Sequence, residues 1–191
     1  MWHSDKAEQI KRLTKDVNVK KDNIKDITYY VPKKVSADPI TLYPVITVDH
    51  EANVVRISFF AMFVNTQAST YMQGVSMQIG DAHWLNFDTI SARVDGKVYE
   101  LKYDILREHR DVQSGSSGIS TWLFGASSVS VVEYYEEPMD AYAFEMFRTI
   151  AHAQDVYIRF SGRDFQTEKA MSKKKIAIEK NMYDLYQAIK S

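Results

Sequence analysis

The chain has 191 residues and carries 24 lysine and arginine side chains against 25 aspartate and glutamate side chains, a formal net charge of −1. This balance excludes the global basic field that draws proteins onto nucleic acids. The absence of cysteine excludes disulfides, thiolate metal ligands and a cysteine nucleophile. The length fits one domain of ordinary size, and the hydrophobic fraction of 45% predicts a chain that folds around a normal core.

Export and membrane signals are absent from the sequence. It contains no apolar run of the roughly 18 residues that a membrane-spanning helix needs. Residues 1–6 lack the apolar segment of a signal peptide. We therefore expect a cytoplasmic protein if the chain is complete, and a cell-envelope protein if an export signal was removed.

The N-terminal segment, residues 1–23, is expected to be helical and to pack on or flank the core. Ser4 and Asp5 are typical helix caps. They precede apolar residues at spacings of three and four, which predict an amphipathic helix: Ile10, Leu13 and Val17.

Strands are expected after this helix. Residues 20–26 are polar and predict a connector, and Pro32 ends the first β-prone run at 27–31. Two further runs, 41–48 and 54–64, are separated by a link whose length suits a hairpin. The second of them becomes apolar on both faces toward its end, which indicates cover by another layer.

The clearest local signal is Asp95-Gly96, a pair that tolerates positive φ and predicts a type I′ hairpin turn. The turn joins strands at 90–94 and 97–103. It sets Ala92 opposite Tyr99 and Ile90 opposite Leu101, so the apolar alternation and the turn agree on one register.

The regions on either side of this hairpin are less regular. Residues 72–85 predict two short strands that turn at Gly80-Asp81. Residues 107–118 lack apolar periodicity and end in a serine and glycine tract, which predicts the most mobile internal loop. Strands are then expected at 119–124 and 129–135.

The last part of the chain predicts helix, strand and helix. Pro138 and Asp140 introduce a helix at about 140–152, and a strand follows at 156–160. Ser172 can cap a closing helix at about 173–190. One apolar stripe on that helix is expected to face the core: Ile178, Met182, Leu185 and Ile189.

Consecutive strands with few helices between them predict an α+β fold in a single domain, residues 1–191. We expect a predominantly antiparallel β sheet or sandwich. It would carry the N-terminal helix, the inserted helix and the C-terminal helix on its periphery.

The densest acidic and aromatic cluster is the run Glu133, Tyr134, Tyr135, Glu136 and Glu137. Such a cluster suits contact with a sugar or a peptide, and it is equally typical of a strand end that runs into a proline-stopped loop. We nominate it, with His109 and Arg110 of the predicted loop, as a possible binding surface.

No complete catalytic or metal motif is present. The sequence His109-Arg110-Asp111 matches the start of a kinase catalytic loop, but the glycine-rich phosphate loop is missing. Asp81 and His83 are the best metal-ligand pair, and no histidines share a ligand spacing. We therefore expect no catalytic residue, no metal and no cofactor.

Lysines gather near the C-terminus, at residues 173–175 and at Lys180 and Lys190. They could contact phosphate or an anionic membrane. Opposite an apolar stripe, however, lysines are what an exposed helix face ordinarily carries.

Several segments together resemble a group of small β-rich bacterial domains, some of them parts of exported lipoproteins of Gram-positive bacteria. The similarity covers about residues 24–190 and rests on four features: the segment from Phe87-Asp88 through Val94 to Tyr99, the helix after Pro138, the strand Val156 to Gly162 and the lysine-rich last helix. It implies an antiparallel core with peripheral helices and a cell-envelope location. That group has no established activity, so no site residue is transferred.

The leading functional hypothesis is a non-catalytic binding or interaction module for an unknown protein, peptide or glycan. One alternative is a hydrolase that uses Glu133, Glu136 or Asp104 together with a histidine. Another is a peripheral membrane protein held through its basic terminal helices. We expect no nucleic-acid partner, and we do not expect membrane association to be the main role.

Overall fold

The computed structural model describes residues 2–33, 39–72, 75–79, 85–103, 109–116, 127–163 and 165–191, with side chains over 6–33, 39–65, 85–103, 132–163 and 165–191. Its helices are α1 (Trp2–Leu13), the short 3-10 helix η1 (Thr14–Asp16), α3 (Ala141–Ala151) and α4 (Lys173–Lys190). Its strands are β1 (Val17–Asp22), β2 (Ile27–Pro32), β3 (Ile40–Asp49), β4 (Val54–Met72), β5 (Val75–Ile79), β6 (Phe87–Val94), β7 (Lys97–Lys102), β8 (His109–Ser116), β9 (Ser127–Pro138), β10 (Val156–Gly162) and β11 (Gln166–Ala170).

The strands form two antiparallel sheets. The large sheet has seven strands in the order β1-β2-β3-β4-β9-β8, and β5 pairs with the far end of β4. The small sheet has four strands in the order β11-β10-β6-β7. These sheets, with N-terminal, inserted and C-terminal helices, confirm the predicted α+β class and its antiparallel pairing.

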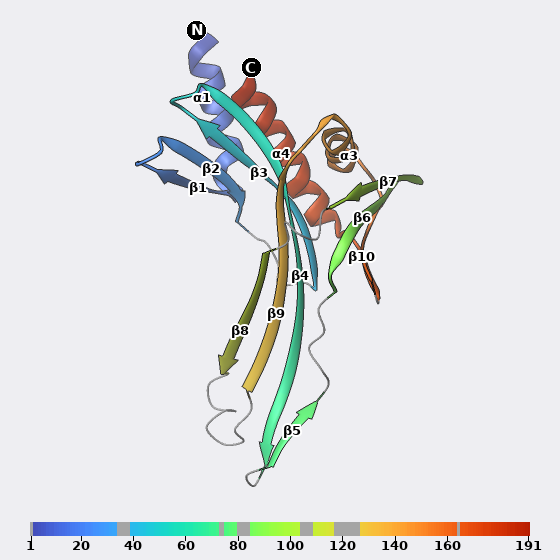
Figure 1. Ribbon diagram of the computed structural model, residues 1–191. Helices are drawn as coiled ribbons and strands as arrows, with labels where there is room; N and C mark the ends of the chain where they lie inside the picture. Colours follow the sequence, from blue (N-terminus) through green and yellow to red (C-terminus); the bar gives the residue numbers. More distant parts are fainter. Residues whose placement is uncertain are drawn as a thin grey trace.

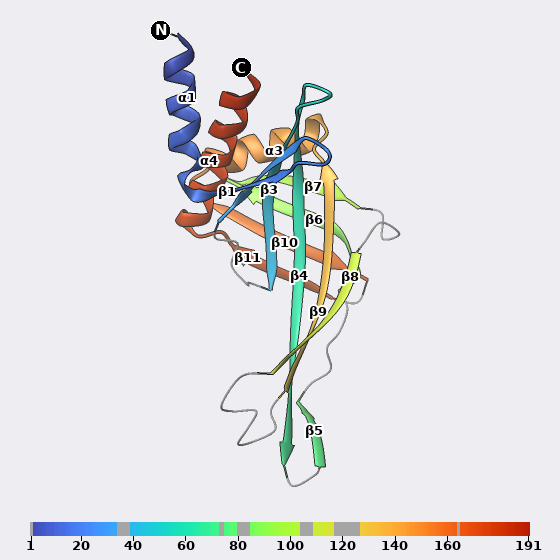
Figure 2. The same ribbon diagram turned by 90° about the vertical axis from the view of Figure 1, so that its left-hand side faces the viewer.

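The hydrophobic core lies between the two sheets and the helices α3 and α4 (Figures 1 and 2). The large sheet contributes alternate residues of β4 from Ile57 to Phe63, among them Phe59 and Ala61, and the small sheet contributes Ile90 and Phe160. α3 and α4 pack on each other, and α1 packs along α4. The side chain of Asn181 fixes α1 by donating a hydrogen bond to the carbonyl of Leu13 at 2.9 Å.

β4 and β9 are long enough to run beyond this core together. Figures 1 and 2 show them extending away from the helices, with β8 and β5 at their sides. Their register runs without a break from the pair Ser58 and Pro138 to the pair Ser69 and Ser127. Both chain termini lie at the opposite end, beside α1 and α4.

The hairpin at Asp95-Gly96 has the predicted turn and register. φ is +47° at Asp95 and +88° at Gly96, and the pairs Ala92 with Tyr99 and Ile90 with Leu101 form as expected. The Asp95 carboxylate also accepts the backbone N–H of Asp155 at 2.8 Å, which holds the turn against the start of β10. This contact is a reason for aspartate at the first turn position.

Both predicted caps of the later helices form. The Asp140 side chain accepts the N–H of Ala143 at 2.7 Å, and the Ser172 side chain accepts that of Lys175 at 3.3 Å. The buried face of α3 includes Ala143, Met146, Phe147 and Ile150.

The buried face of α4 differs from the predicted stripe. Met182 and Leu185 are buried, but Ile178 and Ile189 are only half-buried. Ile176 and Glu179 are buried beside them. The helix is therefore rotated, so that a carboxylate faces inward where the apolar pattern placed an isoleucine.

The N-terminal prediction is wrong in its details. α1 begins at Trp2, so Ser4 and Asp5 lie inside the helix and not at its start. Val17 opens strand β1, which takes up residues 20–22 of the predicted connector at 20–26. β1 is an edge strand with polar, exposed side chains, and its backbone pairing with β2 determines its conformation where the side chains give no signal.

The loop prediction for residues 107–118 is also wrong, because residues 109–116 form strand β8. Their polar residues pair with β9 through the backbone, a partner that local sequence does not reveal. In the region 72–85, the chain reverses between β4 and β5, and β5 covers residues 75–79. Gly80-Asp81 and the predicted strand at 119–124 lie outside the described residues.

Candidate binding sites on two faces of the large sheet

The acidic and aromatic run of β9 is divided between the two faces of the large sheet. Successive side chains of a strand point to opposite sides. Glu133 and Tyr135 point into the core and are 0% and 1% exposed, whereas Tyr134 is half-buried and Glu136 exposed on the outer face. The five residues therefore do not form one continuous surface.

Glu133 is part of the fold. Its Oε1 accepts the N–H of Leu85 at 2.5 Å, and its Oε2 accepts the N–H of Phe87 at 3.3 Å. All three residues are fully buried. The carboxylate thus anchors the entry of β6 to β9 and does not contribute to a ligand surface.

Tyr135 is likewise a core residue. Its ring lies 4.9 Å from that of Phe87, edge to face, and 5.0 Å from that of Tyr103. Such aromatic pairs add to the free energy gained from burial alone. Tyr135 therefore connects the two sheets.

The outer face carries a stack of three rings from adjacent strands, Tyr43 of β3, Phe60 of β4 and Tyr134 of β9, which we call the aromatic face. The ring of Phe60 lies 4.9 Å from that of Tyr43 and 5.5 Å from that of Tyr134, at interplanar angles of 23° and 18°. Each of the three side chains is half-buried. The rings therefore stand side by side across the sheet.

Glu136 lies beside this stack, opposite Phe60 in the register of β4 and β9. Burial and the nearby charge of Glu136 raise the pKa of Tyr43 to about 12. The phenol consequently stays protonated at neutral pH and keeps a hydrogen-bond donor at the edge of the stack.

β8 brings His109 and Arg110 next to the nominated run. His109 is the register partner of Tyr134, and Arg110 is that of Glu133. The backbones of the two sequence-distant parts of the predicted surface thus lie on adjacent strands. The side chains of His109 and Arg110 lie outside the described part of the chain.

Glu137 lies on the inner face at the end of β9 and lines a cleft of about 480 Å³, which we call the acidic cleft. Asp140 and Tyr142 line the same cleft from the start of α3. Strand β7 closes it with Leu101 and Tyr103, and Phe59 contributes from β4. Burial, followed by the charges of Glu137 and Asp140, raises the pKa of Tyr103.

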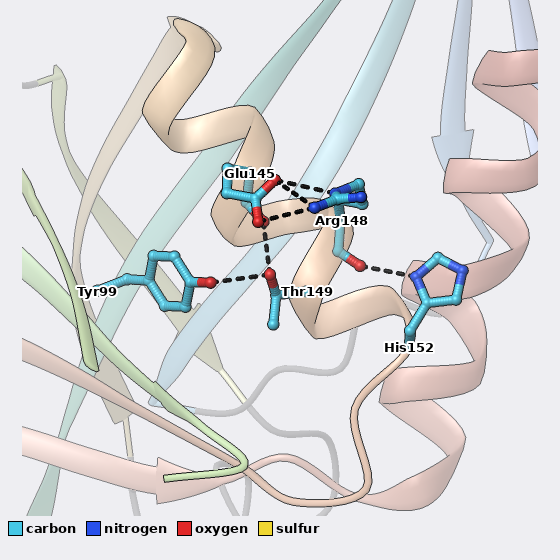
Figure 3. Close-up of polar contacts among 5 residues, drawn as sticks. All are labelled: Tyr99, Glu145, Arg148, Thr149 and His152. Carbon is cyan, nitrogen blue, oxygen red and sulfur yellow. Dashed lines mark hydrogen bonds and ion pairs between the residues drawn. The ribbon is translucent and has the colours of Figure 1, made fainter. Parts of the chain in front are cut away.

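A polar cluster joins β7 to α3 near this cleft (Figure 3). The hydroxyl of Tyr99 lies 2.8 Å from Oγ1 of Thr149, which donates to the carbonyl of Glu145. Arg148 forms a two-bond ion pair with the Glu145 carboxylate, and Nδ1 of His152 lies 2.8 Å from the Arg148 carbonyl. The Thr149 hydroxyl also lies within hydrogen-bonding reach of the Glu145 carboxylate, which Arg148 holds in its ion pair.

His50, the other histidine whose side chain is described, also has its hydrogen-bond partner away from β9. Its Nε2 lies 2.9 Å from Oγ1 of Thr28 on β2, which β3 and β4 separate from β9 in the sheet. Within the described residues, neither His50 nor His152 has a hydrogen bond or ion pair with Glu133 or Glu136. Asp104 lies outside the described residues.

Within the described part of the chain, no group of three or more histidine, aspartate or glutamate side chains is placed to hold a metal ion. No described helix is long and apolar enough to cross a membrane. On α4, Lys180 pairs with Asp184 at 2.6 Å, Lys173 donates to the carbonyl of Gln154, and Lys190 lies over the ring of Tyr186.

Comparison with known proteins adds no relative. No protein-family model matches the chain, and no curated protein matches it in sequence. The resemblance to small domains of exported lipoproteins therefore stays a prediction, and the function must be argued from the two sites themselves.

Proposed function

We propose that the protein is a non-catalytic binding module that takes its ligand on the aromatic face of the large sheet. The observation that supports this most is the ring stack of Tyr43, Phe60 and Tyr134 on three adjacent strands. The helices and the small sheet pack on the opposite face, toward which Phe59 and Ala61 point. The aromatic face therefore lies on the side of the sheet away from this core.

The geometry of the stack favours a protein or peptide ligand. Parallel rings that lie against one another turn their edges outward and not their flat faces, which a stacked sugar would need. Tyrosine offers a large contact area at a small cost in conformational entropy, with a hydroxyl at its tip. Each ring is held by its neighbour before any ligand arrives, which reduces the entropy lost on binding.

The proposal is tested with two libraries, a phage-displayed random peptide library and a glycan array. We expect peptides to be selected, and Tyr43→Ala or Tyr134→Ala to weaken their binding about tenfold or more, as for residues at interface centres. Tyr157→Ala is the matched control, because Tyr157 is an exposed tyrosine on the outer face of the small sheet.

The possible outcomes test the position of the site and the class of its ligand separately. Glycan binding that depends on Tyr43 and Tyr134 would support the aromatic face as the site and show that its ligand is a glycan and not a peptide. Ligands whose affinity is lowered equally by Tyr157→Ala, or by none of the three changes, would contradict the proposal. The hydrolase and membrane alternatives have no observation of their own that favours them.

A further inference from the structure

The acidic cleft lies beside an open edge of the small sheet. β7 is the last strand in the order β11-β10-β6-β7, and within the described residues it pairs with β6 alone. The N–H of Tyr103 donates to the backbone carbonyl of Asp88 in β6, at 2.6 Å. Because backbone groups alternate along an antiparallel strand, the N–H groups of Glu100 and Lys102 face away from β6.

One hydrogen bond confirms that the N–H of Glu100 faces away from β6. The N–H of Glu100 donates to the hydroxyl of Tyr142 at 3.2 Å, across the cleft from β7. Tyr142 is an exposed residue, 48% accessible, in the first turn of α3. A side-chain hydroxyl thus occupies a position that a neighbouring strand would otherwise fill, and an incoming carbonyl could replace it.

The cleft under this edge has an apolar floor and aromatic walls. Phe59 and Leu101 are buried at its base, and Tyr103 and Tyr142 stand on its sides. Its volume of about 480 Å³ lies within the range of roughly 300–1,000 Å³ that is usual for ligand pockets.

The charges around the cleft are mainly negative. Among the described residues, Glu100, Glu137 and Asp140 line it together with one cation, Lys102. Lys102 is 80% exposed and approaches Glu100 at 3.7 Å, so its charge is directed largely to solvent. The effect of Glu137 and Asp140 on the pKa of Tyr103 shows that their negative charge reaches the aromatic wall.

We propose that the acidic cleft is a second binding site, which takes an extended basic peptide segment of a partner protein. The segment pairs with β7 at Glu100 and Lys102 and places a lysine or arginine side chain between Tyr103 and Tyr142. Strand addition to an open edge supplies backbone hydrogen bonds, and the pocket beside the edge recognises alternate side chains of the added segment. Carboxylates and aromatic rings both attract a cation.

This site is separate from the aromatic face. Glu137 and Tyr103 lie on the inner side of the large sheet, whereas the ring stack lies on its outer side. Changes at one site therefore leave the other intact, and each proposal can fail alone.

The charge requirement is tested by fluorescence anisotropy with a short labelled peptide that alternates threonine and lysine. A second peptide carries glutamine in place of each lysine. We expect the basic peptide alone to bind, and Glu137→Gln to weaken it about tenfold, as for the loss of a hydrogen bond to a charged group. Glu168→Gln is the matched control, because Glu168 pairs with Arg159 on β11, away from the cleft.

The strand requirement is tested with two changes at one position. Lys102→Pro removes an N–H that faces away from β6, a substitution that an edge strand tolerates. Lys102→Gln removes the same charge and keeps the N–H. We expect the glutamine variant to bind the basic peptide at least as tightly as the wild type, and the proline variant to lose most of the binding.

Three results would overturn the proposal: equal binding of the two peptides, no effect of Glu137→Gln, or equal affinities of the Lys102→Pro and Lys102→Gln variants. Thermal melts of every variant show whether it is folded. If Lys102→Pro does not fold, hydrogen exchange decides the same question in the wild type, where the basic peptide must slow the amide of Lys102. An unchanged exchange rate would contradict strand pairing.

Discussion

The hydroxyl of Tyr99 lies 2.8 Å from Oγ1 of Thr149, and this contact joins the edge strand β7 to helix α3. The Thr149 hydroxyl donates its one proton to the carbonyl of Glu145 at 2.8 Å. Tyr99 must therefore be the donor toward Thr149. β7 and α3 form two sides of the acidic cleft, so this hydrogen bond helps to fix its width.

Tyr99→Phe removes the donor and keeps the ring, and we expect it to lower the free energy of unfolding by about 1 kcal/mol, the usual net value of a hydrogen bond. Thr149→Val removes the acceptor. Urea unfolding of both single variants and the double variant measures their coupling. Strictly additive effects would show that the two groups do not interact.

Glu179 is a buried carboxyl group on α4, and it makes stability depend on pH. It is 4% exposed, and its Oε2 has no hydrogen-bond partner. Burial raises its pKa from 4.5 to about 8, although Lys175, one turn earlier, acts in the opposite direction. The side chain is therefore protonated in the folded protein at neutral pH.

The sign of the effect follows from proton binding. Between pH 4.5 and about 8 the folded state holds a proton on Glu179 that the unfolded chain has released. The free energy of unfolding therefore falls as the pH rises through this range. One pKa unit corresponds to about 1.4 kcal/mol, so the loss amounts to several kcal/mol.

Glu179→Gln should remove this component. We expect the variant to gain stability over the wild type as the pH is raised from 5 to 9, measured by urea unfolding at each pH. Glu168→Gln, which changes an exposed acid, is the control. Parallel stability curves for wild type and Glu179→Gln would contradict the buried, protonated state.

Local sequence signals predicted those parts of the fold that local interactions determine. The turn at Asp95-Gly96 predicted its own register, and Asp140 and Ser172 predicted their helix starts. The sequence does not predict strand β8, because its residues are mostly polar and lack apolar periodicity, and its conformation depends on backbone pairing with β9.

The same difference between local and long-range interactions decides which site residues the sequence can predict. The burial of Glu133 and Glu179 is decided by the elements that pack around them, and a carboxylate gives no sequence signal for it. The aromatic face was partly accessible to sequence. The hairpin of β3 and β4 pairs Asp49 with Val54, and this register already sets Tyr43 opposite Phe60.

Two glycines should respond differently to alanine. A Cβ at Gly162 would lie 1.8 Å from the carbonyl oxygen of Leu85, so backbone must move. We expect Gly162→Ala to cost about 3 kcal/mol, the upper part of the range for overpacking. Around Gly96 a Cβ meets nothing within 4 Å, and its φ of +88° alone should cost about 1 kcal/mol. Equal melting temperatures of the two variants would contradict this.

Glu133 should be more important for stability than any exposed acid of β9. Its two oxygens accept the N–H groups of Leu85 and Phe87, and all three residues are fully buried. In Glu133→Gln the side-chain oxygen can accept only one of them, and the amide nitrogen faces the other. A buried donor left without a partner costs about 1–3 kcal/mol.

Glu136→Gln is the matched control, because Glu136 is three residues along the same strand, on the exposed outer face. We expect it to change the free energy of unfolding by less than about 0.5 kcal/mol. Glu133→Ala should cost more than Glu133→Gln, since it leaves both N–H groups unpaired and a cavity beside them. Hydrogen exchange locates the effect: the amides of Leu85 and Phe87 should exchange faster in Glu133→Gln and at the wild-type rate in Glu136→Gln. If the two glutamine variants unfold at the same urea concentration, the carboxylate does not anchor β6, and Glu133 is available for another role.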